Sequence, residues 1–302
     1  MNRNSEEDPM DVFVTGATGW IGSATVDELL ANGHRVTGLA RSDDSAKTLE
    51  ARGATALRGD LDDLDSLRRG AVAADAVVHL ANKHDFGPES DRAERAAVEA
   101  MAAALAGSGK PFVVANGLSG VVEGRPALES DVSPVDSRGD SENLALSYVD
   151  RGVRTIIARF APSVHGAGDW GFVTFLADAA RRRGVSGYID DGSTAWSAVH
   201  RSDAARAIRL GIEKAPAGTR MHVVAEESVS TREIAEALGK SLGLPVVAVA
   251  RENAAEHFGL MAQFFGLGMA ASSTRTRELL GWTPTGPTLL DDIAAGAYGS
   301  AS

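Results

Sequence analysis

The chain has 302 residues, 44% of them hydrophobic and 24% charged, a composition that is ordinary for a globular protein and excludes disorder as its main state. The formal net charge is −11, and no dense basic run exists beyond the three arginines at 181–183, which argues against nucleic acid or a membrane surface as a partner. The absence of cysteine excludes disulfides, thiolate nucleophiles and cysteine-based metal sites.

The first residues, MNRNSEEDPMD, are acidic and polar and lack the basic and then apolar order of a signal peptide. No apolar stretch approaches the roughly 18 residues that a membrane-spanning helix needs. We therefore expect a cytoplasmic protein in which residues 1–9 form a disordered extension.

Residues 10–160 alternate between short apolar runs and helix-favouring segments. Runs rich in valine and isoleucine predict strands buried on both faces: DVFVTG from Asp11, HRVTGLA from His34, DAVVHLA from Asp75, PFVVAN from Pro111 and VRTIIARF from Val153. Helices are predicted between them, at Ser23–Asn32, at Leu64–Val72 and from Asp91. Regular alternation of this kind predicts an α/β fold, a doubly wound parallel Rossmann sheet.

Beyond residue 160 the alternation is less regular. Helices are predicted from Gly171, Ser202, Ser230 and Ser273, and MHVVA and VVAVA predict short strands. Ser230 with Glu233 three residues later has the spacing of a capping box. We expect residues 161–302 to form a smaller substrate-binding region interleaved with the last strands of the sheet.

Three glycines follow the first predicted strand, at Gly16, Gly19 and Gly22. In a strand–turn–helix unit such glycines permit the tight turn, the close approach of phosphates and the packing of helix on strand. The backbone N–H groups at the helix start can then bind a diphosphate. The sequence therefore predicts a dinucleotide site that also includes Thr18, Trp20 and Ile21.

The end of the second predicted strand indicates which dinucleotide is bound. Arg41 lies nineteen residues after Gly22 with Ser42 beside it, where an NAD site would have a carboxylate for the ribose. A guanidinium binds phosphate oxygens in a bidentate manner, which favours NADP(H). The alternative is a solvated Arg41 with Asp43 or Asp44 on the ribose.

Several motifs carry a resemblance to a known family: TGATGWIG, GDLDD with Asp60, HLA at residues 79–81, VHRSDAARA and LGWTP. With them the chain resembles the short-chain dehydrogenase/reductase superfamily, in its extended or atypical branch of NAD(P)-dependent epimerase/dehydratase-like oxidoreductases. The resemblance implies a homodimer and further cofactor contacts, with Asp60 and Leu61 at the adenine, Leu80, Ala81 and Asn82 along the cofactor, and Pro162 and Val164 beside the nicotinamide.

The family's Tyr-x-x-x-Lys pair is missing, because none of the three tyrosines has a lysine four residues later. Near the two expected positions the chain has Pro134 and Arg138, and Arg138 is retained as a cofactor candidate. The strand that usually ends in two serines offers Asn116 and Ser119 instead, and Asn116 is taken as a candidate cofactor contact. Loss of the tyrosine weakens ketone reduction, which needs a proton donor, more than reduction of an iminium ion, which is already protonated.

Four side chains are candidate catalytic groups: Lys83 and His84 after a predicted strand, Ser119, and His165 in the segment beside the nicotinamide. The alternative for His165 is a packing role and for Ser119 a turn hydroxyl. His79 is expected in the core, and His200 is expected to bond backbone and Asp203. No metal site is predicted, since no His-Glu-x-x-His or similar spacing occurs.

These observations predict an NADPH-dependent reductase that transfers hydride to a C=O or C=N group of a small apolar substrate. The alternatives are a sugar-nucleotide epimerase/dehydratase-like enzyme and a non-catalytic NADP-binding sensor or scaffold. Seven aromatic residues of the second half are candidates for an apolar pocket, with about half of them expected in the core: Trp170, Phe172, Phe175, Trp196, Phe258, Phe264 and Phe265.

Overall fold

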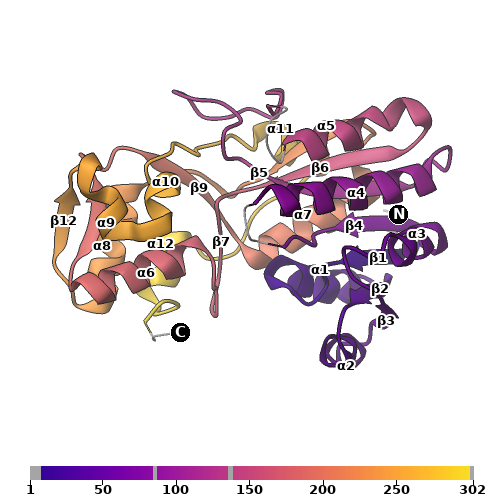
Figure 1. Cartoon of the computed structure of the whole chain (residues 1–302), viewed down its shortest axis with the longest axis horizontal. Coiled ribbons are helices and arrows are strands. Elements are labelled where there is room, and N and C mark those ends of the chain that lie inside the picture. The colour runs from indigo at the N-terminus through magenta and orange to yellow at the C-terminus, as the bar shows by residue number, and fades with distance from the viewer. Residues whose placement is uncertain (1–7, 84–86, 135–138, 300–302) are drawn as a thin grey trace, which may run out of the picture. The chain divides into compact units, whose positions relative to one another are not determined.

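The computed structural model describes residues 8–83, 87–134 and 139–299. Within these ranges a seven-stranded sheet has the strand order β10-β6-β5-β4-β1-β2-β3 (Figure 1). Its strands are β1 (Asp11–Thr15), β2 (Arg35–Ala40), β3 (Thr55–Arg58), β4 (Ala76–His79), β5 (Pro111–Gly117), β6 (Arg154–Phe160) and β10 (Thr219–Val223). Neighbours from β3 to β5 pair in parallel, which confirms the predicted doubly wound α/β fold.

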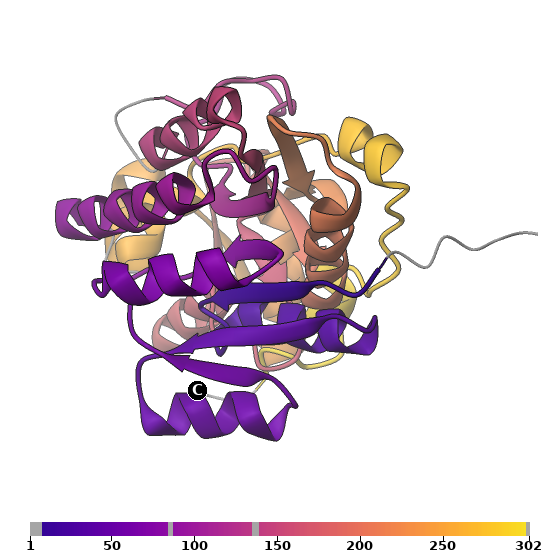
Figure 2. The same ribbon diagram turned by 90° about the vertical axis from the view of Figure 1, so that its right-hand side faces the viewer.

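Helices cover both faces of this sheet. On one face, α3 (Leu64–Ala73), α4 (Pro88–Leu105) and α5 (Gly139–Ser147) enclose a core that includes Phe13, Met101 and Phe112. On the other, α1 (Trp20–Ala31) and α7 (Arg201–Lys214) are joined by an ion pair in which Arg209 Nε lies 2.8 Å from Glu28 Oε1. Figure 2 shows β1, β2 and β3 side by side, with α2 (Asp43–Ala51) beyond them.

The edge strand β3 was not predicted. Its four residues, TALR, are only partly buried, so they lack the apolar run that marks the central strands. By contrast, the predicted glycine turn is present: β1 ends at Thr15, and α1 begins at Trp20, three residues before the predicted helix start at Ser23. The capping box of Ser230 and Glu233 is present at the start of α8 (Thr231–Leu242).

The chain divides into two compact units. The first contains the residues up to 116 together with 133–158 and 205–221, and the second contains 117–132, 159–204 and the residues from 222 onward. The expected division near residue 160 stays a prediction. So does the disordered extension, since residues 1–7 lie outside the described part of the chain.

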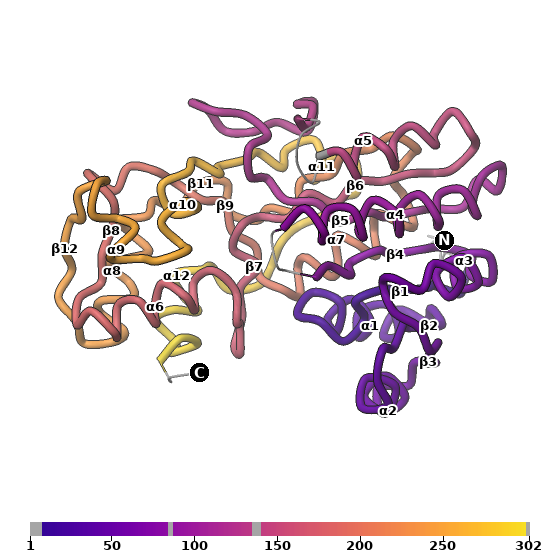
Figure 3. The backbone as a smooth tube through the Cα atoms, in the orientation of Figure 1, coloured from indigo at the N-terminus to yellow at the C-terminus, as the bar shows by residue number. Residues whose placement is uncertain are grey.

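The second unit has two small sheets, which Figure 3 traces among its helices. One has the order β11-β9-β7, and the other pairs β8 with β12 in parallel. The strands are β7 (Ser163–His165), β8 (Ser186–Ile189), β9 (Ala195–His200), β11 (Glu226–Ser230) and β12 (Val246–Val249). The remaining helices are α6 (Phe172–Arg183), α9 (Ala254–Phe258), α10 (Ala262–Phe265), α11 (Thr274–Leu280) and α12 (Leu289–Ala294), with 3₁₀ turns at Val149–Arg151, Arg251–Asn253 and Gly259–Met261.

The core of the second unit contains Trp196, Phe258 and Phe265, whose rings contact one another edge to face at centroid distances of 5.2–5.3 Å. Trp170 and Phe175 differ, since they are 52% and 50% exposed. Among the described residues, no helix combines the length and the hydropathy needed to cross a bilayer.

Gly22 is the position at which a side chain is least tolerated by the first unit. A Cβ atom there would stand 2.0 Å from the carbonyl oxygen of Gly16, a backbone atom that cannot rotate away. We expect Gly22→Ala to lower the free energy of unfolding by at least about 1–3 kcal/mol. Urea unfolding measures the effect, and Gly268→Ala is the control, because a Cβ there meets no atom within 4 Å. Equal midpoints for the two variants would contradict this account.

Candidate cofactor site

The turn between β1 and α1 brings the backbone of two strands together. Gly16 has φ +66°, and a Cβ on it would lie 2.8 Å from the backbone nitrogen of Ala81, just after β4. The Gly19 N–H donates to the Gly16 carbonyl over 2.9 Å and closes the turn. The predicted glycines therefore occupy positions where the chain requires them, as a Gly-rich phosphate-binding turn does.

The amino end of α1 follows directly after the glycine turn. Its N-cap residue Gly19 offers no side chain to the first N–H groups, and the first turn holds no acidic residue. Thr18 and Gly19 are exposed, while Trp20 and Ile21 are half-buried. The N–H groups and the partial positive charge of this helix end can therefore receive an anionic group such as a diphosphate.

Thr15 fixes the ends of β1 and β4 next to each other. Its buried hydroxyl oxygen accepts from the N–H groups of Leu80 and Ala81, each over 3.2 Å. The hydroxyl also lies 2.7 Å from Nδ1 of His79 and can donate its proton there. His79 is thus a buried residue of the strand end, as expected, and Leu80 and Ala81 lie beside the glycine turn.

The end of β2 carries the charge that distinguishes the two dinucleotides. Arg41 is exposed directly after β2, and among the described residues its guanidinium has no ion-pair partner. Ser42 serves as the N-cap of α2, accepting from the Ser45 N–H over 3.1 Å. Asp43 is engaged by Arg58, with 3.3 Å between Oδ1 and Nη2, and Arg58 faces Ala40 in the β2–β3 register.

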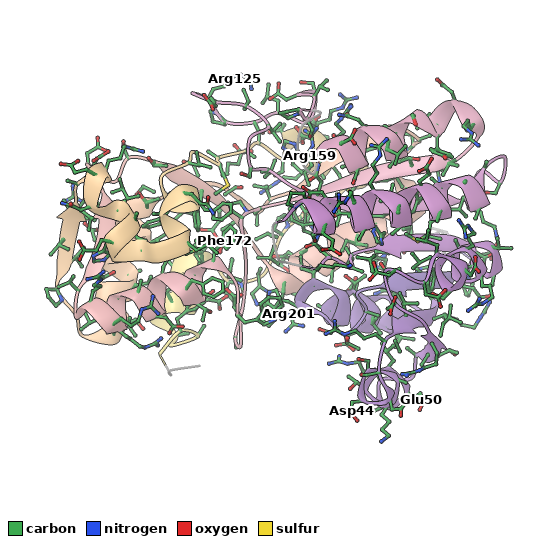
Figure 4. All side chains as sticks on the ribbon, viewed as in Figure 1. Asp44, Glu50, Arg125, Arg159, Phe172 and Arg201 are labelled. Carbon is green, nitrogen blue, oxygen red and sulfur yellow. The ribbon has the colours of Figure 1, made fainter. Side chains whose placement is uncertain are left out.

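Two arginines therefore lie at adjacent strand ends at this edge of the sheet, Arg41 directly after β2 and Arg58 as the last residue of β3. Of the two carboxylates that could replace Arg41 at a ribose, Asp43 is tied to Arg58 and Asp44 lies on the exposed side of α2 (Figure 4). Arg58 was not singled out from the sequence, because its position depends on the unpredicted strand β3.

The loop after β3 is held by its own carboxylates. Asp60 Oδ1 accepts from the N–H groups of Asp62 and Asp63, each over 2.9 Å, and Leu61 is half-buried between them. Lys83 reaches back to this loop, with its Nζ 2.9 Å from Asp62. The ion pair between Lys83 and Asp62 thus connects the segment after β4 with the loop expected at the adenine.

Of the remaining predicted residues after β4, Asn82 donates from Nδ2 to Glu94 on α4. His84 lies outside the described residues, as does Arg138. Their roles stay predictions.

Asn116 lies near the end of β5 and is 7% exposed. Its Nδ2 donates over 2.7 Å to Glu142 on α5, a buried carboxylate that also accepts from the Ser133 hydroxyl and from Arg220. Sequence reasoning missed Glu142. The available signal was its position four residues after Arg138, at the start of a segment that favours a helix.

In the second unit, the segment expected beside the nicotinamide forms β7. Pro162 and Val164 are half-buried, and the register places His165 opposite His200 on β9. Ser119 is exposed in the segment that follows β5.

His165 belongs to a buried group of ionisable side chains. It is 0% exposed, its Nδ1 lies 2.6 Å from Asp292 on α12, and its Nε2 lies 3.7 Å from Glu226. The His200 ring approaches its edge at 5.6 Å, and burial lowers the pKa of His200. In this arrangement His165 ties β7 to α12, and a role as proton donor would require its side chain to become accessible.

His200 hydrogen-bonds locally. Its Nδ1 lies 2.7 Å from the Ser202 hydroxyl and 3.3 Å from the Ser202 nitrogen. Asp203 accepts from the N–H groups of Thr285 and Gly286. The backbone contact expected for His200 is therefore present.

Asp169 provides a pH-dependent prediction for the second unit. Burial raises the pKa of Asp169, and the hydrogen bonds from Gly171 and Tyr298 offset this only in part. An acid whose folded pKa lies above its unfolded value lowers stability as the pH rises through that interval. We expect the stability of the wild type relative to Asp169→Asn to fall as the pH rises above about 4, measured by urea unfolding from pH 4 to pH 7.

Asp131 is expected to show the opposite pH dependence of stability, because Arg125 lowers its pKa to about 2. Stability that Asp131 contributes is present above about pH 4 and is lost as the pH falls toward 2, so Asp131→Asn is expected to cost stability at pH 7. A flat difference between wild type and Asp169→Asn over the whole range would contradict the effect of burial.

Comparison with known proteins gives the family. The model of the NAD dependent epimerase/dehydratase family matches residues 12–106. Uncharacterized protein C2A9.02 of Schizosaccharomyces pombe is 41% identical over 295 residues, which cover 96% of this chain and 100% of that protein. Uncharacterized protein YLL056C of Saccharomyces cerevisiae is 42% identical over 293 residues, covering 95% and 98%.

A more distant relative from Stigmatella aurantiaca, 4-hydroxy-2-methyl-3-oxo-4-farnesyl-3,4-dihydroquinoline-1-oxide ketoreductase, is 28% identical over 69% of this chain and 66% of its own length. The solved structure of DesIV, a dTDP-glucose 4,6-dehydratase from Streptomyces venezuelae with NAD bound, superposes with a TM-score of 0.75. At 20% identity over 95% of this chain and 96% of that one, it shows a likeness of fold alone. By its relatives, its family model and its sheet, the chain belongs to the NAD-dependent epimerase/dehydratase family of NAD(P)-dependent enzymes.

Proposed function

We propose that the protein is an NADPH-dependent reductase that transfers hydride to a C=O or C=N group of a small apolar substrate. The observation that carries the proposal is the glycine turn at the amino end of α1, where the N-cap is a glycine and the first turn has no acidic residue, with Arg41 at the end of the neighbouring strand. These groups fit a dinucleotide, which binds over a turn packed closely on the strand ends. A side chain at Gly16 or Gly22 would collide with backbone atoms and prevent that packing. Bound NADPH would supply a hydride to an electrophilic carbon.

The preference for NADPH over NADH rests on charge. Arg41 is free to bind a 2′-phosphate, and Arg58 adds a second guanidinium nearby while engaging Asp43. A carboxylate that accepts the ribose 2′-hydroxyl is the usual mark of an NAD site, and Asp43 is held by Arg58 instead. The surroundings of this strand end therefore favour a phosphate.

The nature of the reducible group follows from the missing tyrosine. Ketone reduction creates an alkoxide that needs a positioned proton donor, whereas an iminium carbon needs only correct placement and charge stabilisation. Lys83, His84 and Ser119 remain the candidate groups toward the substrate. His165 is buried and bonded to Asp292, so we assign it a structural role in the resting protein.

An apolar substrate is supported by Trp170 and Phe175, large aromatic side chains left about half exposed in the second unit. The Stigmatella relative is named a ketoreductase of a farnesyl-bearing dihydroquinoline oxide, a largely apolar molecule. For this chain we propose an apolar substrate as a class, and not that compound. A homodimer and a cytoplasmic location stay predictions.

One alternative has an observation in its favour. The absence of a Tyr-x-x-x-Lys pair fits a non-catalytic NADP-binding sensor or scaffold, and it weighs against an epimerase or dehydratase that depends on this pair. A sensor would bind NADPH tightly and oxidise it with no substrate of any class.

Arg41→Asp tests the choice of cofactor. Replacing the guanidinium by a carboxylate removes a charge-assisted contact to the 2′-phosphate and adds repulsion, so we expect NADPH affinity to fall about 10- to 100-fold while NADH affinity does not fall. Isothermal titration calorimetry with both dinucleotides measures this. Arg69→Asp on α3 makes the same charge change at another exposed arginine and controls for net charge. Unchanged NADPH affinity in Arg41→Asp would refute the role of Arg41.

The reductase itself is tested by following NADPH oxidation with a panel of apolar ketones and cyclic imines. We expect turnover, faster with imines, and we expect His84→Ala to slow ketone reduction by about 10²-fold while sparing protonated imines, because only the ketone needs a donated proton. Tight NADPH binding without turnover on either class would favour the sensor. Equal losses on both substrates would remove His84 as the proton donor.

A further inference from the structure

Lys83 and Asp62 form an ion pair between two loops of the first unit. The Nζ atom of Lys83 lies 2.9 Å from Oδ1 of Asp62 and 2.9 Å from its Oδ2, so the ammonium group contacts both carboxylate oxygens. Lys83 follows β4 by four residues, and Asp62 follows β3 by four residues. The two side chains are 30% and 65% exposed, so the pair lies at the surface of this unit.

The two strands that precede these loops are not neighbours in the sheet. In the strand order β4-β1-β2-β3, the strands β1 and β2 lie between them (Figure 1). All of these neighbours pair in parallel, so the four strands end at the same edge of the sheet. Three strand spacings separate β3 from β4 by about 14 Å. The loops that follow them must therefore extend toward each other beside the ends of β1 and β2 in order to meet.

Each of the two loops is also held by contacts of its own. Oδ1 of Asp60 accepts from the N–H groups of Asp62 and of the next residue, each over 2.9 Å. In the other loop, Asn82 donates from Nδ2 to Glu94 on α4. The helices that follow the loops, α3 and α4, share one core on the same face of the sheet. The ion pair thus joins two segments whose course is already defined.

The strand ends between these loops indicate what the loops surround. In the proposed function, the diphosphate binds at the amino end of α1, after β1, and the 2′-phosphate binds Arg41, after β2. A single ribose, that of the adenosine part of NADPH, carries both of these groups, at its 5′ and 2′ oxygens. The adenosine must therefore lie at the ends of β1 and β2, and the loops after β3 and β4 flank this position.

We propose that the ion pair of Lys83 and Asp62 joins the two loops into one wall of the adenosine site and so positions them for the cofactor. This inference rests on the proposed function, since it requires an adenine dinucleotide at these strand ends. An exposed ion pair adds little to the stability of the fold, but loops that are already held in place lose less conformational freedom when a ligand binds. Lys83 is thereby assigned to the cofactor, and the candidates toward the substrate narrow to His84 and Ser119.

Two substitutions that change the charge in opposite directions test the pair. Lys83→Met removes a positive charge and Asp62→Asn a negative one, so a purely electrostatic effect on an anionic cofactor would weaken binding in the first variant and strengthen it in the second. Loss of the link weakens binding in both. We expect each variant to bind NADPH about 2- to 5-fold more weakly, the effect of one exposed ion pair, in calorimetry of the full-length protein at fixed ionic strength.

The choice of ligand locates the effect on the adenosine. The same fold loss is expected with NADH, which lacks the 2′-phosphate, and with 2′-phospho-ADP-ribose, which lacks the nicotinamide, because both contain the adenosine diphosphate part. The double variant with Lys83→Met and Asp62→Asn is expected to lose no more than either single variant, because each single change already breaks the pair.

Asp65→Asn is the matched control. Asp65 pairs with Arg68 over 2.8 Å, and both residues belong to α3, so this exposed pair lies within one helix. The substitution makes the same charge change as Asp62→Asn at a carboxylate three residues away. It is expected not to weaken NADPH binding. Urea midpoints close to that of the wild type show that the variants are folded.

Four results would overturn the inference and leave the proposed function standing. They are tighter NADPH binding by Asp62→Asn, unchanged binding by Lys83→Met, additive losses in the double variant, and an equal loss in Asp65→Asn. A loss with NADPH but not with 2′-phospho-ADP-ribose would place the effect at the nicotinamide and would overturn it as well. If the wild type bound neither NADPH nor NADH, the proposed function and the inference would fail together.

Discussion

The close approach of the β1–α1 turn to the end of β4 is the constraint on which the rest of the candidate site depends. Gly22 leaves room for the carbonyl of Gly16, and Gly16 in turn lies against the backbone of Ala81. Thr15 holds the same two strand ends with hydrogen bonds to Leu80 and Ala81. As a result, the direction of the first N–H groups of α1 is fixed by the backbone packing of the turn, and these groups can point toward a bound phosphate.

Ion pairs between neighbouring side chains determine which charges near the glycine turn are available to a ligand. The acidic chain keeps its carboxylates engaged near the β2 end, where Arg58 binds Asp43 and Lys83 binds Asp62. Exposed pairs of this kind add little stability, so their main effect is on which charges remain available to a ligand. Among the residues that the structure describes, Arg41 is a cation at this strand end without an ion-pair partner, which favours a phosphate in spite of the overall charge of −11.

Most of the first unit could be predicted from the sequence because its determinants are local. Valine- and isoleucine-rich runs predict the central strands, and the glycine spacing predicts the turn that lies between β1 and α1. The network around Glu142 could not be predicted in the same way, since Asn116 is 26 residues and Arg220 78 residues away along the chain. The burial of His165 likewise depends on Asp292, 127 residues later. Contacts of this length are set by packing and leave no periodic signal in the sequence.

The missing Tyr-x-x-x-Lys pair and the burial of His165 both favour C=N over C=O reduction. Near the positions of the tyrosine and lysine the chain has Pro134 and Arg138. Glu142 follows four residues later, and its carboxylate accepts hydrogen bonds from Asn116, Ser133 and Arg220. Such a network can orient a cofactor or substrate, because its hydrogen bonds fix the side chains that form it. His165, one of the catalytic candidates, is enclosed by Asp292 and Glu226. With Glu142 and His165 engaged in this way, the site is suited to a substrate that is already protonated. An iminium ion has this property, and C=N reduction is therefore the favoured form of the proposal.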